Sequence, residues 1–344
     1  KKASEETAAA VKELKDQGAK KIILDLRGNP GGLLTEAIRV SNLFLPKGKL
    51  ITTTKSVIQK YNKQYFTENE PLDTDIPVVV LINGRSASAS EIVSGSLQDY
   101  DRAVIVGARS FGKGLVQRPK KLTYGTQAKI TISRYYTPSG RCIQALDYWH
   151  RDDQGNAIRT NVEDYNEFST ANGRKVYDGG GIFPDIEVES AKLSAITEAL
   201  LGDRAIFDYA TKYYYAHSPG DLDAFSFRES DYSDFKSFLN STDFDYKTET
   251  EKSLEEAYIN AEKDGLQTAI SSNYSELTSK IDALKKAELD HKKKEISNII
   301  SDELIKRYFY RDGLYKYQLK NNTEIEEAIA VLNDPARYKK ILKP

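Results

Sequence analysis

The chain has 344 residues, enough to bury more than one hydrophobic core, and its 39% hydrophobic and 29% charged residues are typical of a globular protein. Its 50 basic and 51 acidic residues give a net charge of −1, which excludes a global positive field that would recruit nucleic acid or anionic membrane. No apolar run approaches the length of a membrane span, and Cys142 is the only cysteine, so an intrachain disulfide is excluded.

The first part of the chain alternates helical and strand patterns. Ala8, Val11 and Leu14 recur at helical spacing, which predicts a helix over 4–17 that ends at Gly18. The further predicted elements, in chain order, are a strand at 22–26, a helix at 33–45, a strand at 77–82, a helix at 88–98, a strand at 103–107 and an alternating strand at 128–135. This alternation predicts an α/β fold in which helices cover a largely parallel sheet.

The composition changes toward the second half of the chain. Residues 147–180 are polar and rich in turn formers, and we expect them to form a long loop or insertion. From 191 onward glycine almost vanishes and helical periodicity dominates, for example over 251–270 and 276–311. The sequence therefore predicts an α/β core up to residue 190 and a mainly helical domain over 191–344.

Ser88 is the first candidate for chemistry because it lies where a buried strand gives way to a helix. Ser88-Ala89-Ser90-Glu91 fits a capping box, and helix capping is the commoner role for such a serine. The same position places a hydroxyl beside the free N–H groups of a helix N-terminus, which favour the oxyanion of acyl transfer. The N–H of Ala89 is the natural donor, and the capping and catalytic roles can coexist.

Lys113 is the second candidate, since a neutral lysine can take the proton of a serine nucleophile. An ordinary solvated lysine at a glycine-rich turn is one alternative. Another is a phosphate-binding loop, because residues 107–113 spell G-x-x-x-x-G-K after a strand. Gly114 stands where that loop needs Ser or Thr, and Pro119 follows in an extended segment instead of a helix, which weakens the second alternative.

Three further features gain meaning only beside this pair. Gln117 lies four residues after Lys113, so in an extended segment both side chains would point to the same side and Gln117 could orient the amine. The turn at 27–32 is rich in glycine and can turn its N–H groups toward a ligand. Asp99 is a charge near a helix end. Each also has a plain structural reading, as a strand-surface amide, a strand-to-helix turn and a structural ion-pair partner.

Taken together, these segments resemble the carboxy-terminal processing, or tail-specific, serine peptidases. The order and spacing of the matching segments agree over roughly residues 4–190. The segments are Leu24-Asp25-Leu26-Arg27-Gly28-Asn29-Pro30-Gly31-Gly32, Ser86-Ala87-Ser88-Ala89-Ser90-Glu91-Ile92, Gln98-Asp99-Tyr100, Gly107, Phe111-Gly112-Lys113-Gly114-Leu115-Val116-Gln117, Tyr135-Tyr136-Thr137-Pro138-Ser139-Gly140-Arg141 with Ile143-Gln144, and Gly181-Ile182-Phe183-Pro184-Asp185-Ile186.

The resemblance implies a Ser/Lys catalytic site. Carried over by position, Ser88 is the nucleophile, Lys113 the general base and Gln117 its orienting partner. Asp99 matches an acidic position that the family places near the site. We therefore expect a serine endopeptidase that cleaves extended C-terminal tails through an acyl-enzyme, with no cofactor and no metal. The alternative is a module of the same fold that binds peptide tails or apolar ligands without turnover.

The resemblance also implies the surroundings of the site. The oxyanion donors would be the N–H of Ala89 and that of Gly31 or Gly32, and the fold would be a ββα sheet core related to the Clp and crotonase group. Family members carry a PDZ domain before this core, and this sequence shows none; position 85 is Arg where a small or acidic residue is usual. The region 191–344 lies outside the shared core, and we expect it to cover the core, to mediate self-association or to dock an adaptor. An extracytoplasmic, periplasm-like location is implied by the family alone.

Overall fold

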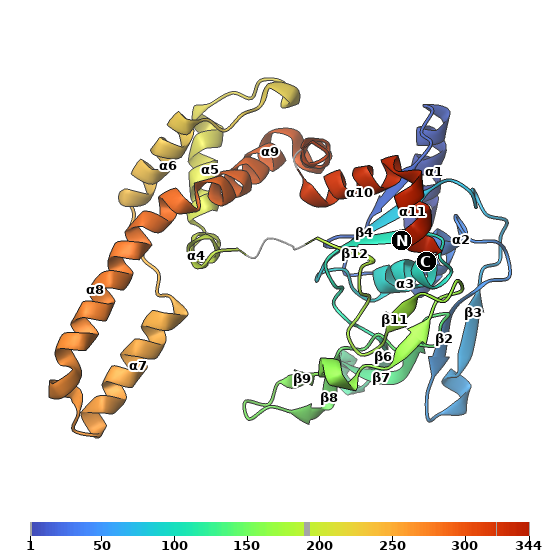
Figure 1. Ribbon diagram of the computed structural model, residues 1–344, viewed down its shortest axis with the longest axis horizontal. Helices are drawn as coiled ribbons and strands as arrows, with labels where there is room; N and C mark the ends of the chain where they lie inside the picture. The colour runs from blue at the N-terminus through green and yellow to red at the C-terminus, as the bar shows by residue number, and fades with distance from the viewer. Residues whose placement is uncertain (1, 189–192, 321, 344) are drawn as a thin grey trace. The chain divides into compact units, whose positions relative to one another are not determined.

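The computed structural model describes residues 2–188, 193–320 and 322–343 (Figure 1). The chain forms two compact units. The first comprises Lys1–Ser190 together with Thr323–Pro344, and the second comprises Ala191–Asn322. The first unit carries all of the candidate site residues, and the second is built from helices.

A four-stranded parallel sheet forms the centre of the first unit. Its strands are β1 (Ile22–Asp25), β4 (Val78–Ile82), β5 (Val104–Gly107) and β12 (Ile186–Glu187), in the order β1-β4-β5-β12. All three pairings are parallel. The strands at 22–26, 77–82 and 103–107 are thereby confirmed as the buried strands of an α/β fold.

Strand β4 shows why this sheet needs cover on both faces. Its side chains alternate, so Val78, Val80 and Ile82 pack into one hydrophobic cluster while Val79 and Leu81 pack into another. All five side chains are fully buried. A continuous apolar strand of this kind is stable only between two layers of helices.

Helices supply those two layers (Figure 1). The cluster that contains Val78 also takes side chains from α1 (Ala3–Asp16), α2 (Leu34–Asn42) and α3 (Ala89–Asp99). The cluster on the opposite face is completed by α10 (Thr323–Asn333) and α11 (Pro335–Leu342). The first unit is thus a three-layer α/β/α arrangement.

The two last helices correct the predicted boundary of the helical region, which had assigned all of 191–344 to one helical domain. Ile325 and Val331 of α10 and Leu342 of α11 pack against the parallel sheet. Tyr338 also donates its hydroxyl to the Val78 carbonyl at 3.0 Å and accepts the Val78 N–H at 3.0 Å. Helical periodicity shows that a face is apolar but not which sheet it covers.

A second, antiparallel sheet lies in the same unit, in the order β3-β2-β7-β6. Its strands are β2 (Leu50–Lys55), β3 (Lys63–Phe66), β6 (Leu115–Lys121) and β7 (Gln127–Tyr136). The predicted strand at 128–135 lies within β7. The sheet has β3 at one edge and β6 at the other.

The region 147–180 differs from the predicted long loop, because it forms two small hairpins. Strands β8 and β9 pair with each other, as do β10 and β11. Their bounds are Leu146–Arg151, Ala157–Arg159, Glu167–Ser169 and Lys175–Tyr177. Turn residues such as Gly155, with φ +83°, were read from the sequence as loop formers, but here they close hairpins.

The second unit consists of six α-helices over its described residues. They are α4 (Ala195–Gly202), α5 (Ala205–Ala216), α6 (Glu229–Asn240), α7 (Glu249–Lys263), α8 (Gln267–His291) and α9 (Lys293–Gln318). The aromatic residues Tyr209, Tyr232 and Phe235 form the centre of its core. The helix predicted over 251–270 is interrupted at Gly265, whose φ of +69° separates α7 from α8.

Short 3₁₀ turns occur in both units. They lie at Gln59–Tyr61, Thr123–Gly125 and Val162–Asp164 in the first unit and at Leu222–Ala224 in the second.

Candidate active site

Ser88 lies in a strained backbone turn directly before α3. Its φ of 58° and ψ of −114° fall in a region that L-residues rarely adopt. Such strain persists only where the surrounding contacts enforce it, and it is concentrated at functional sites. Ser88 is half-buried, and its N–H donates to Glu91 Oε2 at 2.7 Å, as the predicted capping box requires. The turn therefore presents the serine at the N-terminus of a helix.

The glycine-rich turn after β1 lies directly against Ser88. A Cβ on Gly31, whose φ is +90°, would stand 2.5 Å from the Ala87 carbonyl oxygen, 2.6 Å from the Ala89 nitrogen and 3.0 Å from Ser88 Cβ. The Asn29 carbonyl also accepts the Ala87 N–H at 3.0 Å. Only glycine fits this approach, so the turn and the serine form one local structure.

The proposed oxyanion donors differ in their availability. The Gly31 N–H donates to Asn29 Oδ1 at 2.9 Å and is occupied within its own turn. Within residues 2–188, no hydrogen bond uses the N–H of Gly32 or that of Ala89. The first N–H groups of a helix have no intrahelical acceptor, which explains the free donor at Ala89. Gly32 and Ala89 therefore offer the open N–H groups beside Ser88.

Glu91 joins the serine turn to the lysine loop. Its Oε2 accepts the N–H of Ser88 at 2.7 Å and that of Lys113 at 2.9 Å. Its Oε1 accepts the Gly112 N–H at 2.7 Å and the Ser110 hydroxyl at 2.5 Å. Burial raises the pKa of the Glu91 carboxyl, although all four hydrogen bonds act in the opposite direction. One carboxylate thus fixes the backbone of both candidate residues.

Among the residues that the structure describes, the Lys113 side chain makes no hydrogen bond to Ser88. Lys113 is half-buried, and no hydrogen bond within residues 2–188 joins its Nζ to Ser88 Oγ. The hydroxyl of buried Tyr135 lies beside both residues, since it donates to the Lys113 carbonyl. Burial raises the pKa of Tyr135 well above its usual value, with the Glu91 charge acting the same way and the Ser88 hydroxyl acting against both. The structure brings the two backbones together and leaves the final approach to the flexible lysine side chain.

Within residues 2–188, Gln117 makes no hydrogen bond to Lys113. It is exposed in β6, and its Nε2 donates to Thr131 Oγ1 at 3.5 Å. Lys113 lies before the strand begins at Leu115, in a segment held by Gly112 and Gly114. The argument from even spacing assumed one continuous extended segment, and the chain is extended as a strand only from Leu115 onward.

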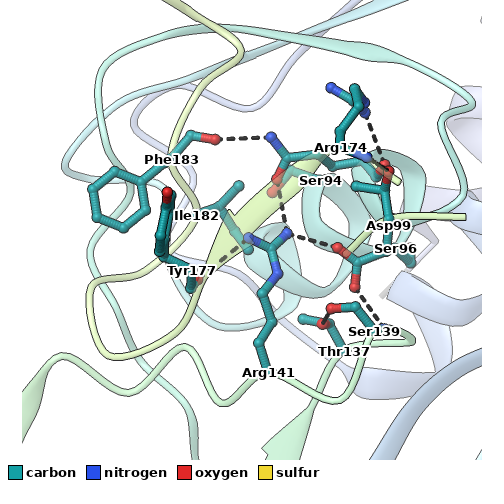
Figure 2. A network of polar contacts seen from close by, with 12 residues as sticks. Ser94, Ser96, Asp99, Thr137, Ser139, Arg141, Arg174, Tyr177, Ile182 and Phe183 are labelled. Atoms are coloured by element: carbon teal, nitrogen blue, oxygen red, sulfur yellow. Dashed lines mark hydrogen bonds and ion pairs between the residues drawn. The ribbon is translucent and has the colours of Figure 1, made fainter. Parts of the chain in front are cut away.

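Asp99 does not lie at the site. It is the last residue of α3, about 16 Å along the helix axis from Ser88 at 1.5 Å per residue. Its carboxylate is buried, pairs with Arg141 at 2.8 Å and accepts the Ser139 N–H at 2.9 Å (Figure 2). Position in the family motif suggested a role near the nucleophile, but the helix carries Asp99 to its far end. Its role here is to hold the turn at 137–141.

A wider polar network surrounds that ion pair (Figure 2). Fully buried Arg141 also donates to Gln98 Oε1 at 2.7 Å, and Gln98 Nε2 donates to the Phe183 carbonyl at 2.9 Å. Arg174 donates to the Gln98 carbonyl at 3.0 Å and pairs with Asp185 at 2.5 Å. These contacts join the end of α3 to two of the segments that match the family, at 135–141 and 181–186. They give both segments a structural role.

A pocket of about 440 Å³ opens beside the serine turn. Gly31, Gly32 and Ala89 form part of its wall, and most of the remaining wall is apolar. Its further apolar side chains are Ala3, Leu24, Leu26, Leu33, Ala37, Val40 and Val93. The open N–H donors therefore border a space that suits an apolar side chain.

Two contributions were missed at the level of sequence. Glu91 was expected only to cap the helix, and Tyr135 was matched only as part of a motif. The capping pattern was the one available signal for Glu91, because its bonds to Gly112 and Lys113 cross the fold. No sequence signal placed the Tyr135 hydroxyl between the two candidate residues.

The fold and the site define a class of protein: an α/β protein with a serine held in a strained strand-to-helix turn beside a glycine turn and a lysine loop. Residues 1–148 match "Peptidase family S41", and residues 196–332 match "Probable PDZ-protease, C-terminal helical domain". The first of these matches makes residues 1–148 similar to peptidase family S41. The resemblance to carboxy-terminal processing peptidases is thereby confirmed.

Several known proteins are similar to parts of this chain. A carboxyl-terminal-processing protease of Synechocystis sp. is 44% identical over 144 residues, which cover 42% of this chain and 33% of that protein. A probable CtpA-like serine protease of Staphylococcus epidermidis is 32% identical over 211 residues, which cover 60% of this chain and 40% of that protein. The solved photosystem II D1 C-terminal processing protease is similar with a TM-score of 0.41 and 27% identity, over 55% of this chain and 39% of that one. The chain thus spans only about a third to two fifths of the length of these relatives.

Proposed function

We propose that this chain is a serine endopeptidase that cleaves C-terminal tails of protein substrates through an acyl-enzyme. The observation that carries the proposal is the shared Glu91 carboxylate, which holds the backbones of Ser88 and Lys113 on one oxygen. The strained φ of Ser88 adds to it, because such a turn exposes a nucleophile beside helix N–H groups. The S41 family and the protease relatives support the same reaction class.

In the proposed mechanism Ser88 Oγ attacks the scissile carbonyl carbon. The neutral amine of Lys113 takes the hydroxyl proton and then gives it to the leaving amine. The N–H groups of Ala89 and Gly32 hold the oxyanion, and Gly31 would join them only by releasing Asn29. A water molecule then attacks the ester carbon of the acyl-enzyme, again giving a proton to Lys113, and Ser88 is restored.

The lysine must reorient before this reaction. Its side chain has four rotatable bonds, so Nζ can move while the backbone stays bonded to Glu91. Cβ atoms on Gly112 and Gly114 would approach Ala145 and Gln144 to 2.3 Å and 2.8 Å, so these glycines let the loop pack closely. We assign Lys113 as the base on this placement and leave Gln117 and Asp99 outside the catalytic group.

The substrate class is proposed from the apolar pocket and from the family. Leu24, Leu33 and Val93 line the space next to the proposed oxyanion donors, which suits an apolar residue at the cleaved bond. An extended tail can pair with a free sheet edge by main-chain hydrogen bonds, and β6 offers such an edge immediately after Lys113. Both features favour unfolded, partly apolar tails.

The direct test uses cleavage of an unfolded protein with an apolar C-terminus. Ser88→Ala and Lys113→Ala should each reduce turnover by roughly a hundredfold or more with unchanged circular dichroism, whereas Lys340→Ala, at an exposed lysine of α11, should retain it. The rate should rise toward alkaline pH because only the neutral amine accepts a proton. Turnover that persists in Ser88→Ala would refute the assignment.

The alternative function is that of a module that binds peptide tails or apolar ligands without cleaving them. It is distinguished by labelling with a serine-directed fluorophosphonate probe at alkaline pH, followed by peptide mapping. Labelling at Ser88 that is lost in Lys113→Ala supports the peptidase. Peptide binding without any labelling would support the module.

We also propose a location for the protein and a role for its helical unit, both from the resemblance to the family. The protein would act outside the cytoplasm, as expected for carboxy-terminal processing peptidases; among the described helices none is long and apolar enough to cross a membrane. The helical unit, which matches the C-terminal helical domain of a probable PDZ-protease, would cover the core, self-associate or dock an adaptor. Light scattering of the chain with and without residues 191–322 would test self-association.

A further inference from the structure

The antiparallel sheet carries a concentration of positive charge that the proposed mechanism does not use. We call it the basic surface. It consists of six of the seven exposed cations of β3, the turn before it, β6 and β7: Lys60, Lys63, Arg118, Lys120, Lys121 and Lys129. Three of them, Lys60, Lys63 and Arg118, line a pocket of about 300 Å³ that has no acidic residue in its wall. Lys60 and Arg118 both lie over the Tyr61 ring, at 5.2 Å and 6.0 Å from its centroid.

This charge is not neutralised locally. There is no Asp or Glu anywhere in 50–67 or in 102–146, the two segments that supply all four strands of the sheet. Within residues 2–188 and 322–343, no ion pair involves any cation of the basic surface. The whole chain carries a net charge of −1, so this concentration is a local feature and not a reflection of overall composition.

The basic surface is connected to the candidate site through strand β6. Strand β6 begins two residues after Lys113, and among the described strands it pairs only with β7, which leaves its other edge open. At about 3.3 Å per residue, Arg118 lies roughly 10 Å and Lys121 roughly 20 Å along β6 from its first residue, Leu115. A peptide strand paired with this edge would therefore have its bond near Ser88 and its residues five to eight positions away beside these cations.

We propose that the basic surface binds an acidic segment of the substrate, five to eight residues from the cleaved bond. This inference rests on the proposed peptidase function and adds the substrate's charge to it. The cations occupy both faces of the sheet at this edge: Arg118 and Lys120 share one face, and Lys121 and Lys129 share the other. A strand paired at the edge has side chains on both faces, whereas a flat anionic membrane would contact one, so the arrangement favours a peptide.

The experiment measures binding to the Ser88→Ala chain, which cannot cleave its ligand. Fluorescein-labelled peptides would share one apolar cleavage sequence. Each peptide carries four Glu or four Gln residues, placed five to eight positions from the centre of that sequence. Both placements, before the centre and after it, are measured. The matched variants are Lys120→Gln/Lys121→Gln and Lys339→Gln/Lys340→Gln, because each pair consists of adjacent exposed lysines in the first unit. Wild-type cleavage of the same peptides is followed in parallel.

We expect the Glu peptide to bind roughly threefold to tenfold more tightly than the Gln peptide at low salt, with the difference lost at high salt. The difference should fall in Lys120→Gln/Lys121→Gln and remain in Lys339→Gln/Lys340→Gln. Shifting the Glu residues to within two positions of the cleaved bond should remove this difference as well, because those positions do not reach the cations of β6.

Equal affinity for the two peptides would overturn the inference. So would equal losses in both lysine-pair variants, or binding to phosphatidylglycerol vesicles that depends on Lys120 and Lys121 while the peptides show no preference. If the Glu peptide is preferred but the wild type cleaves neither peptide, the basic surface stands as a binding site and the peptidase assignment fails. If both are cleaved at equal rates and bound equally, the peptidase stands and the charge preference fails.

Discussion

Replacing Gly31 with alanine is the sharpest perturbation of the site that leaves every catalytic side chain in place. The new Cβ would stand 2.5 Å from the Ala87 carbonyl oxygen and 2.6 Å from the Ala89 nitrogen, both of them backbone atoms that cannot rotate away. The φ of +90° at position 31 adds about 1–2 kcal/mol of backbone strain when the residue is alanine. Relief of the overlap costs about 1–3 kcal/mol more.

The expected result is a loss of about 2–5 kcal/mol in the free energy of unfolding of the first unit, from the strain and the overlap combined. The backbone movement that relieves the overlap displaces the Ser88 turn itself. Labelling by a serine-directed probe should therefore slow as well, even at temperatures where the unit is folded. Scanning calorimetry gives the stability, and the labelling rate at Ser88 gives the geometry.

The neighbouring glycine provides the matched control. Gly32 does not adopt a positive φ, and a Cβ there would meet no heavy atom within 4 Å. Gly32→Ala keeps its N–H donor, so stability should change by less than about 0.5 kcal/mol and labelling should persist. Equal stability and equal labelling in the two variants would refute the close approach of the glycine turn to Ser88.

Three further substitutions test other parts of the first unit. Asp99→Asn leaves Arg141 buried with a neutral partner and should lower the free energy of unfolding by about 3 kcal/mol. Labelling of Ser88 should persist in the folded variant at low temperature. Loss of labelling in a variant of unchanged stability would instead indicate a catalytic role for Asp99. Glu91→Gln places an amide NH₂ where one carboxylate oxygen now accepts two donors, so labelling should slow. Because burial raises the pKa of Glu91 above its ordinary 4.5, the native state binds the extra proton, and wild-type stability relative to this variant should grow as pH falls toward 4.5; parallel pH curves would contradict this. The Lys15 ion pair lowers the pKa of Asp73 from 3.8 to about 2, so Asp73→Asn should cost about 1 kcal/mol above pH 4, and this cost should vanish as pH falls through 2 in urea titrations.

Local sequence predicted the parts of the fold that depend on periodicity. The apolar runs that form β1, β4 and β5 are short and bounded by turn residues, and the helices between them have regular apolar faces. These signals are carried by neighbours in the chain, so they can be read without knowing the partner. The hairpins at 147–180 were missed because short polar strands lack an apolar alternation.

The candidate site was predictable in its residue types and less so in its geometry. Ser88 and the glycine turn were expected at one site, and they lie in contact. Gln117 and Asp99 were assigned by position in a motif, but the start of β6 and the length of α3 take them elsewhere. Spacing along a chain fixes a distance only while the secondary structure is continuous.

The sequence by itself determined the class of this protein: the serine at a helix start, the lysine between glycines and the order of the matched segments. The tertiary structure alone decided which groups meet. Glu91 reaches Lys113 across the fold, the last helices return to cover the parallel sheet, and the cations of separate strands gather on the antiparallel sheet. The physical reason is that residue type and periodicity are local properties, whereas hydrogen bonds across loops and packing across a sheet depend on contacts between segments far apart in the chain.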